Sequence, residues 1–132
     1  MTFPPRGEVI GIGTDLVDIA RIRDIAARHG DRFLEKVFTG DERAAMAGRT
    51  DPWPGYAARF AAKEAVAKAF GTGIGEELDL HSISVATDER GAPRVVLDAK
   101  GDALLRSRGG KCIHISLTHT ATLAQAFAVI VA

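Results

Sequence analysis

The side chains best suited to chemistry lie in residues 59–75, RFAAKEAVAKAFGTGIG, where a helical pattern leads into a glycine-rich loop. At about 100° per residue, Arg59 and Lys63 share one side of the expected helix, and Glu64 lies one step round from Lys63. Lys68 follows one turn beyond Glu64. Three cations and a carboxylate on one helix suit a phosphorylated ligand. Glycine allows a close approach to the backbone, and the glycines that follow are Gly71, Gly73 and Gly75.

The same helix also has an ordinary structural interpretation. Glu64 and Lys68 stand four positions apart, which is the spacing of a surface ion pair, and Gly71 stands where a glycine commonly ends a helix. The sequence lacks the local motifs of nucleophile elbows, zinc proteases, thiol redox centres and P-loops. An enzyme with a covalent nucleophile is therefore disfavoured, and the helix alone does not distinguish a site from a surface.

Two further segments could complete a site. Asp15 follows a predicted strand over residues 8–12 and precedes a helical pattern, so it is either a helix N-cap or a second carboxylate. The run SLTHT, residues 116–120, is either a polar turn or the ligand-binding end of a strand. Mg²⁺ prefers oxygen ligands, and one or two carboxylates suffice when phosphate oxygens complete its shell. Asp15, Glu64 and the nearby cations could therefore bind a divalent metal and a phosphorylated ligand.

The elements that must position these residues predict an α+β fold. We expect a strand at 8–12, a helix at 16–30, two short helices within 31–49 with a capping box of Thr39 and Glu42, and a loop at 49–56. After the long helix, residues 82–89 and 94–98 predict a hairpin and residues 99–110 a short helix. Residues 111–120 and 122–132 predict two strands, the last apolar enough for a sheet centre. The class is a largely antiparallel sheet packed against a long central helix and shorter helices.

Size and charge limit the classes of protein. The 132 residues are most simply one domain, residues 8–132, behind a flexible leader at 1–7. Seventeen basic and seventeen acidic residues cancel, so we expect neither a nucleic-acid partner nor a membrane. Cys112 is the single cysteine, which excludes an internal disulfide and suits a reducing cytoplasm. Because it lies in an apolar run, we expect its side chain to be buried. No signal peptide or membrane anchor is recognisable.

Taken in order, three segments resemble one known family. GIGTDLVDIARI, RFAAKEAVAKAFGTGIG and HISLTHT, at these separations, are similar to the holo-acyl-carrier-protein synthases, the small bacterial branch of the 4′-phosphopantetheinyl transferases. The resemblance implies a Mg²⁺-dependent transfer of the phosphopantetheine arm from coenzyme A to a serine of apo-acyl carrier protein, with release of adenosine 3′,5′-bisphosphate. It also implies a homotrimer with its sites between subunits.

The resemblance further implies roles for individual residues. Asp15 and Glu64 match the two metal ligands and form the catalytic group with Lys68, which is expected near the pyrophosphate. Arg21 matches a basic residue that meets the carrier protein, and charge suggests that Arg23 and Arg28 extend this basic surface. The positions that match or neighbour the coenzyme A site are Arg59, Lys63, Lys68, Gly71, Gly73, Ser116, His119 and Thr120.

Several alternatives stay open at the level of sequence. The general base is Glu64, Asp15 or a metal-bound water, and Lys63 either touches phosphate or supports Glu64. A Mg²⁺-dependent hydrolase of nucleotide pyrophosphates would need the same cations and carboxylates, with water as the acceptor. A non-catalytic module that docks a carrier protein or a nucleotide would need only the basic surface. The residues also leave open whether the carrier serves fatty acid or polyketide synthesis.

Overall fold

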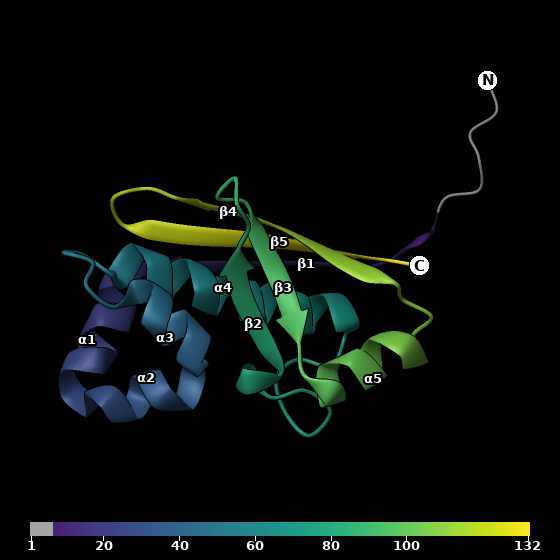
Figure 1. Cartoon of the computed structure of the whole chain (residues 1–132), viewed down its shortest axis with the longest axis horizontal. Coiled ribbons are helices and arrows are strands. Elements are labelled where there is room, and N and C mark those ends of the chain that lie inside the picture. The colour runs from purple at the N-terminus through teal and green to yellow at the C-terminus, as the bar shows by residue number, and fades with distance from the viewer. Residues whose placement is uncertain (1–6) are drawn as a thin grey trace.

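The computed structural model describes residues 7–132 and has the expected α+β architecture. Within these residues the strands form two antiparallel sheets, and α4 lies against one face of the larger sheet (Figure 1). The larger sheet has the order β1–β5–β4 and consists of β1 (Val9–Asp18), β5 (Leu123–Val131) and β4 (Cys112–His119). The smaller sheet pairs β2 (Ile83–Thr87) with β3 (Pro93–Leu97). The helices are α1 (Ile19–His29), α2 (Asp31–Val37), α3 (Gly40–Met46), α4 (Trp53–Phe70), η1 (Leu80–Ser82) and α5 (Ala99–Ser107).

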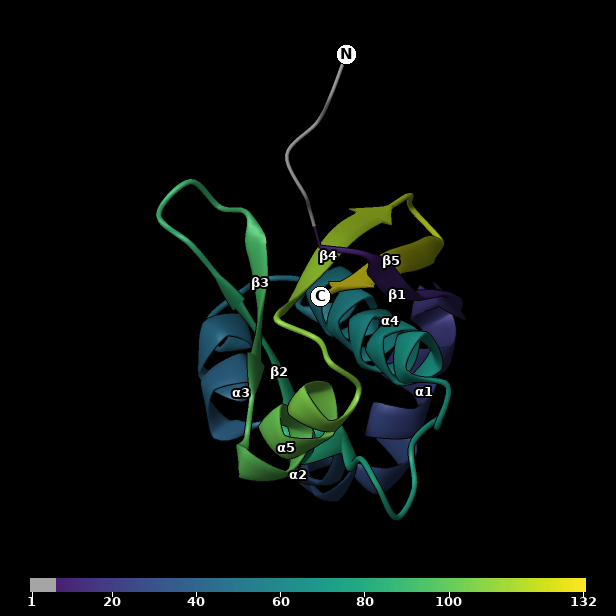
Figure 2. The same cartoon turned by 90° about the vertical axis from the view of Figure 1, so that its right-hand side faces the viewer.

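Helix α4 consists largely of small side chains, and the rest of the chain surrounds it. Its alanines are buried, and Gly71, with a φ of 78°, ends it in the left-handed conformation. Two glycines let the β1 backbone contact the helix directly. A Cβ atom on Gly11 would lie 2.0 Å from the carbonyl oxygen of Ala69, and one on Gly13 would lie 1.8 Å from that of Ala65. Figure 2 shows α4 beneath the larger sheet, with the β2–β3 hairpin to one side and α1 to the other.

The face of the larger sheet that points away from α4 is apolar and open. Successive strand residues point to opposite faces, so Gly13 faces α4 while its neighbour Ile12 faces outward. Ile12 is 66 % exposed, Leu16 is 58 % exposed, and Phe127 on β5 is 47 % exposed. Clustered apolar side chains on one exposed face are typical of a surface that another chain covers.

Strand β1 is longer than the sequence predicts. It continues through residue 18 because it stays paired with β5, and Asp15 lies opposite Ala126 in that pairing. The residue before α1 is Asp18, whose side chain makes no capping hydrogen bond. The N-cap interpretation of Asp15 is therefore wrong. Residues 16, 19, 22 and 25 have helical spacing, but pairing with β5 overrides that pattern at its start.

Two local expectations are wrong, and three are confirmed. Helix α4 begins at Trp53, inside the expected loop, with Pro54 in its first turn, where the missing N–H of proline is not needed. Cys112 is exposed, because it lies on the outer face of the edge strand β4. The Thr39–Glu42 capping box, the hairpin and the central place of β5 are confirmed.

Six residues of the expected leader, 1–6, lie outside the described part of the chain. Of the helices in residues 7–132, none has both the length and the apolar character that crossing a bilayer requires.

Candidate functional site

Asp15 and Glu64 come together across the contact between β1 and α4. Asp15 lies on the same helix-facing side of β1 as Gly13. Gly13 lies against the carbonyl oxygen of Ala65 on α4, and Glu64 is the residue before Ala65. Partial burial raises the pKa of Glu64, and the negative charge of Asp15 raises it further, while Lys68 acts in the opposite direction. The two carboxylates are therefore close enough to repel each other.

Lys68 completes this group from the next turn of α4. Its Nζ lies 3.0 Å from Asp15 Oδ1 and donates to the carbonyl oxygen of Thr14, also at 3.0 Å. The surface-pair interpretation expected Lys68 to bond to Glu64 within the helix, but its ion pair crosses to the strand instead. The Lys68 side chain is 54 % exposed, so the ammonium is free to move toward an approaching anion.

The donor set fits a magnesium ion. Asp15 and Glu64 provide two hard carboxylates, and in residues 7–132 no group of three or more His, Cys, Asp or Glu side chains could hold a metal. Mg²⁺ retains waters and takes phosphate oxygens from a substrate, so two carboxylates are enough. The repulsion that raises the pKa of Glu64 is also the kind of unfavourable interaction that a bound dication relieves.

The glycine loop follows α4 directly, at the end of the helix that carries Lys68. Gly71 and Gly73 have φ values of 78° and 66°, which the other amino acids rarely adopt. No heavy atom lies within 4 Å of a Cβ placed on either residue, so the space beside both is open. The loop follows Lys68 within one turn and leaves its backbone accessible to a ligand near that ammonium.

The residues of the SLTHT run are divided between the two faces of the sheet. His119 pairs with the buried Ala124 and is exposed at the end of β4, on the side that faces α4. Ser116 pairs with the exposed Phe127 and so points to the outer face, away from Asp15 within this chain. Thr120 Oγ1 accepts hydrogen bonds from the backbone N–H groups of residues 122 and 123, and so builds the turn between β4 and β5.

The sequence leaves open whether Lys63 touches phosphate or supports Glu64, and the structure argues against contact with phosphate. The side chain of Lys63 is completely buried, and its Nζ lies 2.7 Å from Glu42 Oε1. The ammonium also donates to the carbonyl oxygens of Leu80 and Ile83, which leaves no donor for a ligand. Burial lowers the pKa of Lys63, and the neighbouring Glu42 carboxylate opposes that shift.

Arg59 shares the Lys63 side of α4, so the structure does not bring it together with Glu64. The residue is 5 % exposed, and burial lowers the pKa of its guanidinium. One Nη donates to the carbonyl oxygen of Gly55 at 3.4 Å, while the buried Nε has no partner within residues 7–132. An unpaired buried donor of this kind is costly, and an anion could satisfy it.

A basic surface covers α1 and α2, where exposed basic side chains outnumber the exposed acidic ones, Asp24, Asp31 and Glu35. Arg21, Arg23 and Arg28 are exposed on α1, as expected from the sequence. Next to them is a pocket of about 360 Å³ that sequence reasoning missed, with lining residues His29, Arg32, Phe33 and Lys36. His29, Arg32 and Lys36 could have indicated it, but only the packing of α1 against α2 places them around the ring of Phe33.

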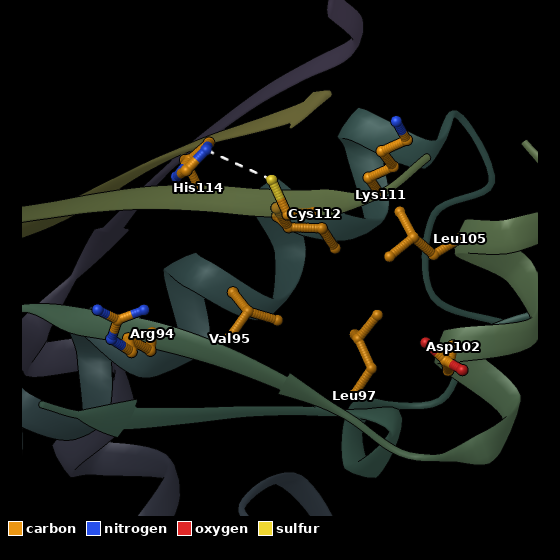
Figure 3. Close-up of a pocket in the computed structure, with 9 residues that line it drawn as sticks. Arg94, Val95, Leu97, Asp102, Leu105, Lys111, Cys112 and His114 are labelled. Atoms are coloured by element: carbon orange, nitrogen blue, oxygen red, sulfur yellow. Dashed lines mark hydrogen bonds between the residues drawn. The ribbon is translucent and has the colours of Figure 1, made fainter. Parts of the chain in front are cut away.

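A second pocket lies between β3, α5 and the beginning of β4 (Figure 3). Cys112 Sγ and His114 Nε2 lie 3.5 Å apart at its rim, and Arg94, Asp102 and Lys111 complete its polar lining. Because β4 runs from Cys112 to His119, this pocket borders the opposite end of the strand from His119. It does not contain the carboxylates of Asp15 and Glu64.

Comparisons with known proteins identify the family of this chain. Residues 11–129 match the family model described as the 4′-phosphopantetheinyl transferase superfamily. A holo-[acyl-carrier-protein] synthase of Chlamydia trachomatis serovar D is 45 % identical over 121 residues, which cover 92 % of this chain and 98 % of that protein.

Solved structures extend the likeness to the fold. The holo-[acyl-carrier-protein] synthase of Neisseria meningitidis superposes with a TM-score of 0.88 at 31 % identity, covering 93 % of this chain and 98 % of that chain. That of Helicobacter pylori, in complex with coenzyme A, gives a TM-score of 0.78 at 29 % identity and covers 90 % of this chain and 98 % of that chain. With its paired carboxylates at the strand–helix contact, this chain belongs to the 4′-phosphopantetheinyl transferase superfamily and, within it, to the holo-[acyl-carrier-protein] synthases.

Proposed function

We propose that this chain transfers the 4′-phosphopantetheine arm of coenzyme A to a serine of apo-acyl carrier protein in a reaction that depends on Mg²⁺. The observation that carries the proposal is the approach of Asp15 to Glu64 beside the ammonium of Lys68. The identity to holo-[acyl-carrier-protein] synthases and the coenzyme A complex of a relative support it. Two carboxylates offer oxygen ligands to a dication, and the lysine offers a mobile charge to a phosphate.

The transfer exchanges one phosphorus–oxygen bond for another. The serine oxygen bonds to the phosphorus nearer the pantetheine, and the bond from that phosphorus to the bridging pyrophosphate oxygen breaks. The electron pair leaves with adenosine 3′,5′-bisphosphate. Asp15 and Glu64 would hold Mg²⁺, which supplies positive charge to the pyrophosphate when bound. The ammonium of Lys68 leaves Asp15, binds the pyrophosphate and stabilises the departing phosphate. The serine proton passes to a carboxylate or to solvent.

The nucleotide of coenzyme A occupies the surface beside this group in our proposal. The open space at Gly71 and Gly73 supports a close approach of the coenzyme to the backbone. The exposed imidazole of His119 supports binding of the 3′-phosphate, whereas Arg59 is buried and would have to become accessible before its unpartnered Nε could contribute. Thr120 contributes by holding the turn that follows His119.

The carrier protein docks on the basic surface of α1 and α2. Arg21, Arg23 and Arg28 offer charge to acidic side chains, and the adjoining pocket offers the ring of Phe33 to an apolar one. Opposite charge speeds the encounter of two proteins, and an apolar anchor slows their separation. An acidic carrier therefore fits this surface better than a neutral one.

The exposed sheet face supports assembly into a homotrimer. Ile12 and Leu16 of β1 and Phe127 of β5 present apolar area that a neighbouring copy would remove from water. Ser116 points to this same outer face, so in an assembly it would meet a neighbouring subunit. We place the reaction in the cytoplasm, which agrees with the single unpaired cysteine.

The decisive experiment incubates the full chain with coenzyme A, MgCl₂ and apo-acyl carrier protein, and measures the mass of the carrier. The carrier should gain the mass of the arm, and EDTA should prevent the gain. Glu64→Gln should lose most of the activity while keeping the circular dichroism spectrum of the parent. Glu89→Gln is the matched control, because Glu89 is exposed in the β2–β3 turn, away from the carboxylate pair.

Other results would contradict the proposal. Release of adenosine 3′,5′-bisphosphate without any carrier would identify a hydrolase. Binding of coenzyme A or carrier with no mass gain across several carriers would identify a non-catalytic module. Unchanged metal dependence in Glu64→Gln would remove Glu64 from the metal site.

A further inference from the structure

Two buried charges lie beside the carboxylate site without belonging to it. Lys63 and Glu42 are each 0 % exposed, and Lys63 uses its ammonium to bond to Glu42 and to the carbonyl oxygens of Leu80 and Ile83. Nζ also lies 5.9 Å from the centroid of the Phe38 ring. The ammonium therefore ties α4 to η1 and β2 by bonds of fixed direction.

The Glu42 carboxylate is bonded just as completely. Oε1 accepts from the backbone N–H of Thr39 at 2.9 Å, which closes the capping box of α3, and Oε2 accepts from the backbone N–H of Val85 at 2.9 Å. Both carboxylate oxygens therefore have a partner in the interior. One carboxylate thus joins α3, β2 and, through Lys63, the long helix.

The bonds of the pair add direction to the packing of α4. Alanines cover much of its buried surface, beside the larger Tyr56, Val66 and Phe70, and the strand it lies against presents Gly11 and Gly13. Small side chains pack closely but offer few interlocking shapes. A buried ion pair contributes little net stability, yet it can select one arrangement among several that are similarly packed.

We propose that the buried Lys63–Glu42 pair is a positioning device that sets the rotation of α4 and thereby turns Glu64 toward Asp15. Lys63 and Glu64 are adjacent, so their side chains diverge by about 100° around the helix axis. Holding Lys63 between α3 and β2 fixes the direction in which Glu64 projects. This inference rests on the proposed role of Glu64 as a metal ligand.

The test measures metal binding and catalysis in Glu42→Gln and Lys63→Met. Mn²⁺ is titrated in the presence of coenzyme A and followed by electron paramagnetic resonance. Residues that orient metal ligands typically change metal affinity by about tenfold or more, so we expect a loss of that size in Glu42→Gln and a larger one in Lys63→Met. In the transfer assay kcat should fall, while KM for the carrier should stay unchanged because neither charge bonds to α1 or α2.

Leu104→Ala is the matched control for a general loss of stability. Leu104 is buried on α5 and bonds to neither charge of the pair, and its truncation leaves a cavity that lowers the melting temperature. We expect Leu104→Ala to keep parental Mn²⁺ affinity at temperatures where circular dichroism reports a folded chain. An equal loss of affinity in this control would overturn the positioning role.

The remaining outcomes separate the inference from the proposal beneath it. If the parent protein binds no Mn²⁺, the metal site itself is wrong. If the parent binds Mn²⁺ and the folded pair variants bind it equally well, only the positioning role is wrong. Should Lys63→Met not fold, Glu42→Gln decides, because it removes the charge while keeping the size of the side chain and a carbonyl acceptor.

Discussion

Replacing Lys68 by methionine should strengthen metal binding by the protein alone and weaken the transfer reaction. Lys68 Nζ lies 3.0 Å from Asp15 Oδ1, and the carboxylate of Asp15 would also be a ligand of a bound dication. In the absence of coenzyme A the ammonium and the metal therefore compete for one carboxylate. Once a pyrophosphate is present, the ammonium has a better partner and the competition ends.

The strength of the Lys68–Asp15 ion pair determines how much the affinity for Mg²⁺ should rise in the absence of coenzyme A. The Lys68 side chain is 54 % exposed and that of Asp15 is 17 % exposed, so water screens the attraction and the pair is worth about 1 kcal/mol or less. Removing it should lower the dissociation constant for Mg²⁺ by up to about fivefold. The second effect is larger, because a preorganised charge at the departing phosphate typically contributes about 10²-fold or more to kcat.

Calorimetric titration with MgCl₂, with and without coenzyme A, measures the first effect, and the transfer assay measures the second. Lys100→Met is the matched control, since Lys100 forms a similar exposed pair with Asp79 at 3.3 Å and has no part in the site. Weaker Mg²⁺ binding by Lys68→Met in the absence of coenzyme A would refute the competition. Full transfer activity in Lys68→Met would remove the lysine from the catalytic group.

Three further results are expected. Burial and Asp15 raise the pKa of Glu64 from its usual 4.5, so the folded chain holds this proton more tightly than the unfolded chain, and the resulting stability is present at low pH and lost as the pH rises through the raised value. In EDTA, the melting temperature of Glu64→Gln should therefore rise relative to that of the parent between pH 4 and pH 7. A difference in melting temperature that stays constant over this range would contradict the prediction. Gly13→Ala places a Cβ 1.8 Å from the carbonyl oxygen of Ala65 and should destabilise the fold by about 1–3 kcal/mol in urea unfolding, whereas no change would show that the strand is free to move away. Leu16→Glu should convert the assembly to monomers in sedimentation, and a parent that already sediments as a monomer would exclude the trimer.

The candidate site residues on α4 could be proposed from local motifs because they stand at short spacings in the sequence. Glu64 and Lys68 share one helix, and the glycines follow directly. What the sequence could not show is how α4 is oriented. Lys63 reads as one more cation of the same helix, and only the fold reveals Glu42, from a separate helix, bonded to it in the interior.

The structural environment of Asp15 could not be predicted from the residues around it. A run of apolar residues at helical spacing follows it, and local spacing contains no information on a partner strand at the other end of the chain. Ser116 illustrates the same limit, because in a strand a shift of one position reverses the face to which a side chain points. Hairpins and capping boxes were predicted correctly because their determinants lie within a few residues of one another.

The direct contact between the β1 backbone and α4 sets the width of the gap in which a metal would sit. Gly11 and Gly13 let the β1 backbone lie directly against α4, which brings the short side chain of Asp15 toward the helix that carries Glu64. Residues that have no reactive group thus influence how far apart the two carboxylates stand. A search for variants with altered metal preference should begin with these two glycines as well as with the proposed ligands.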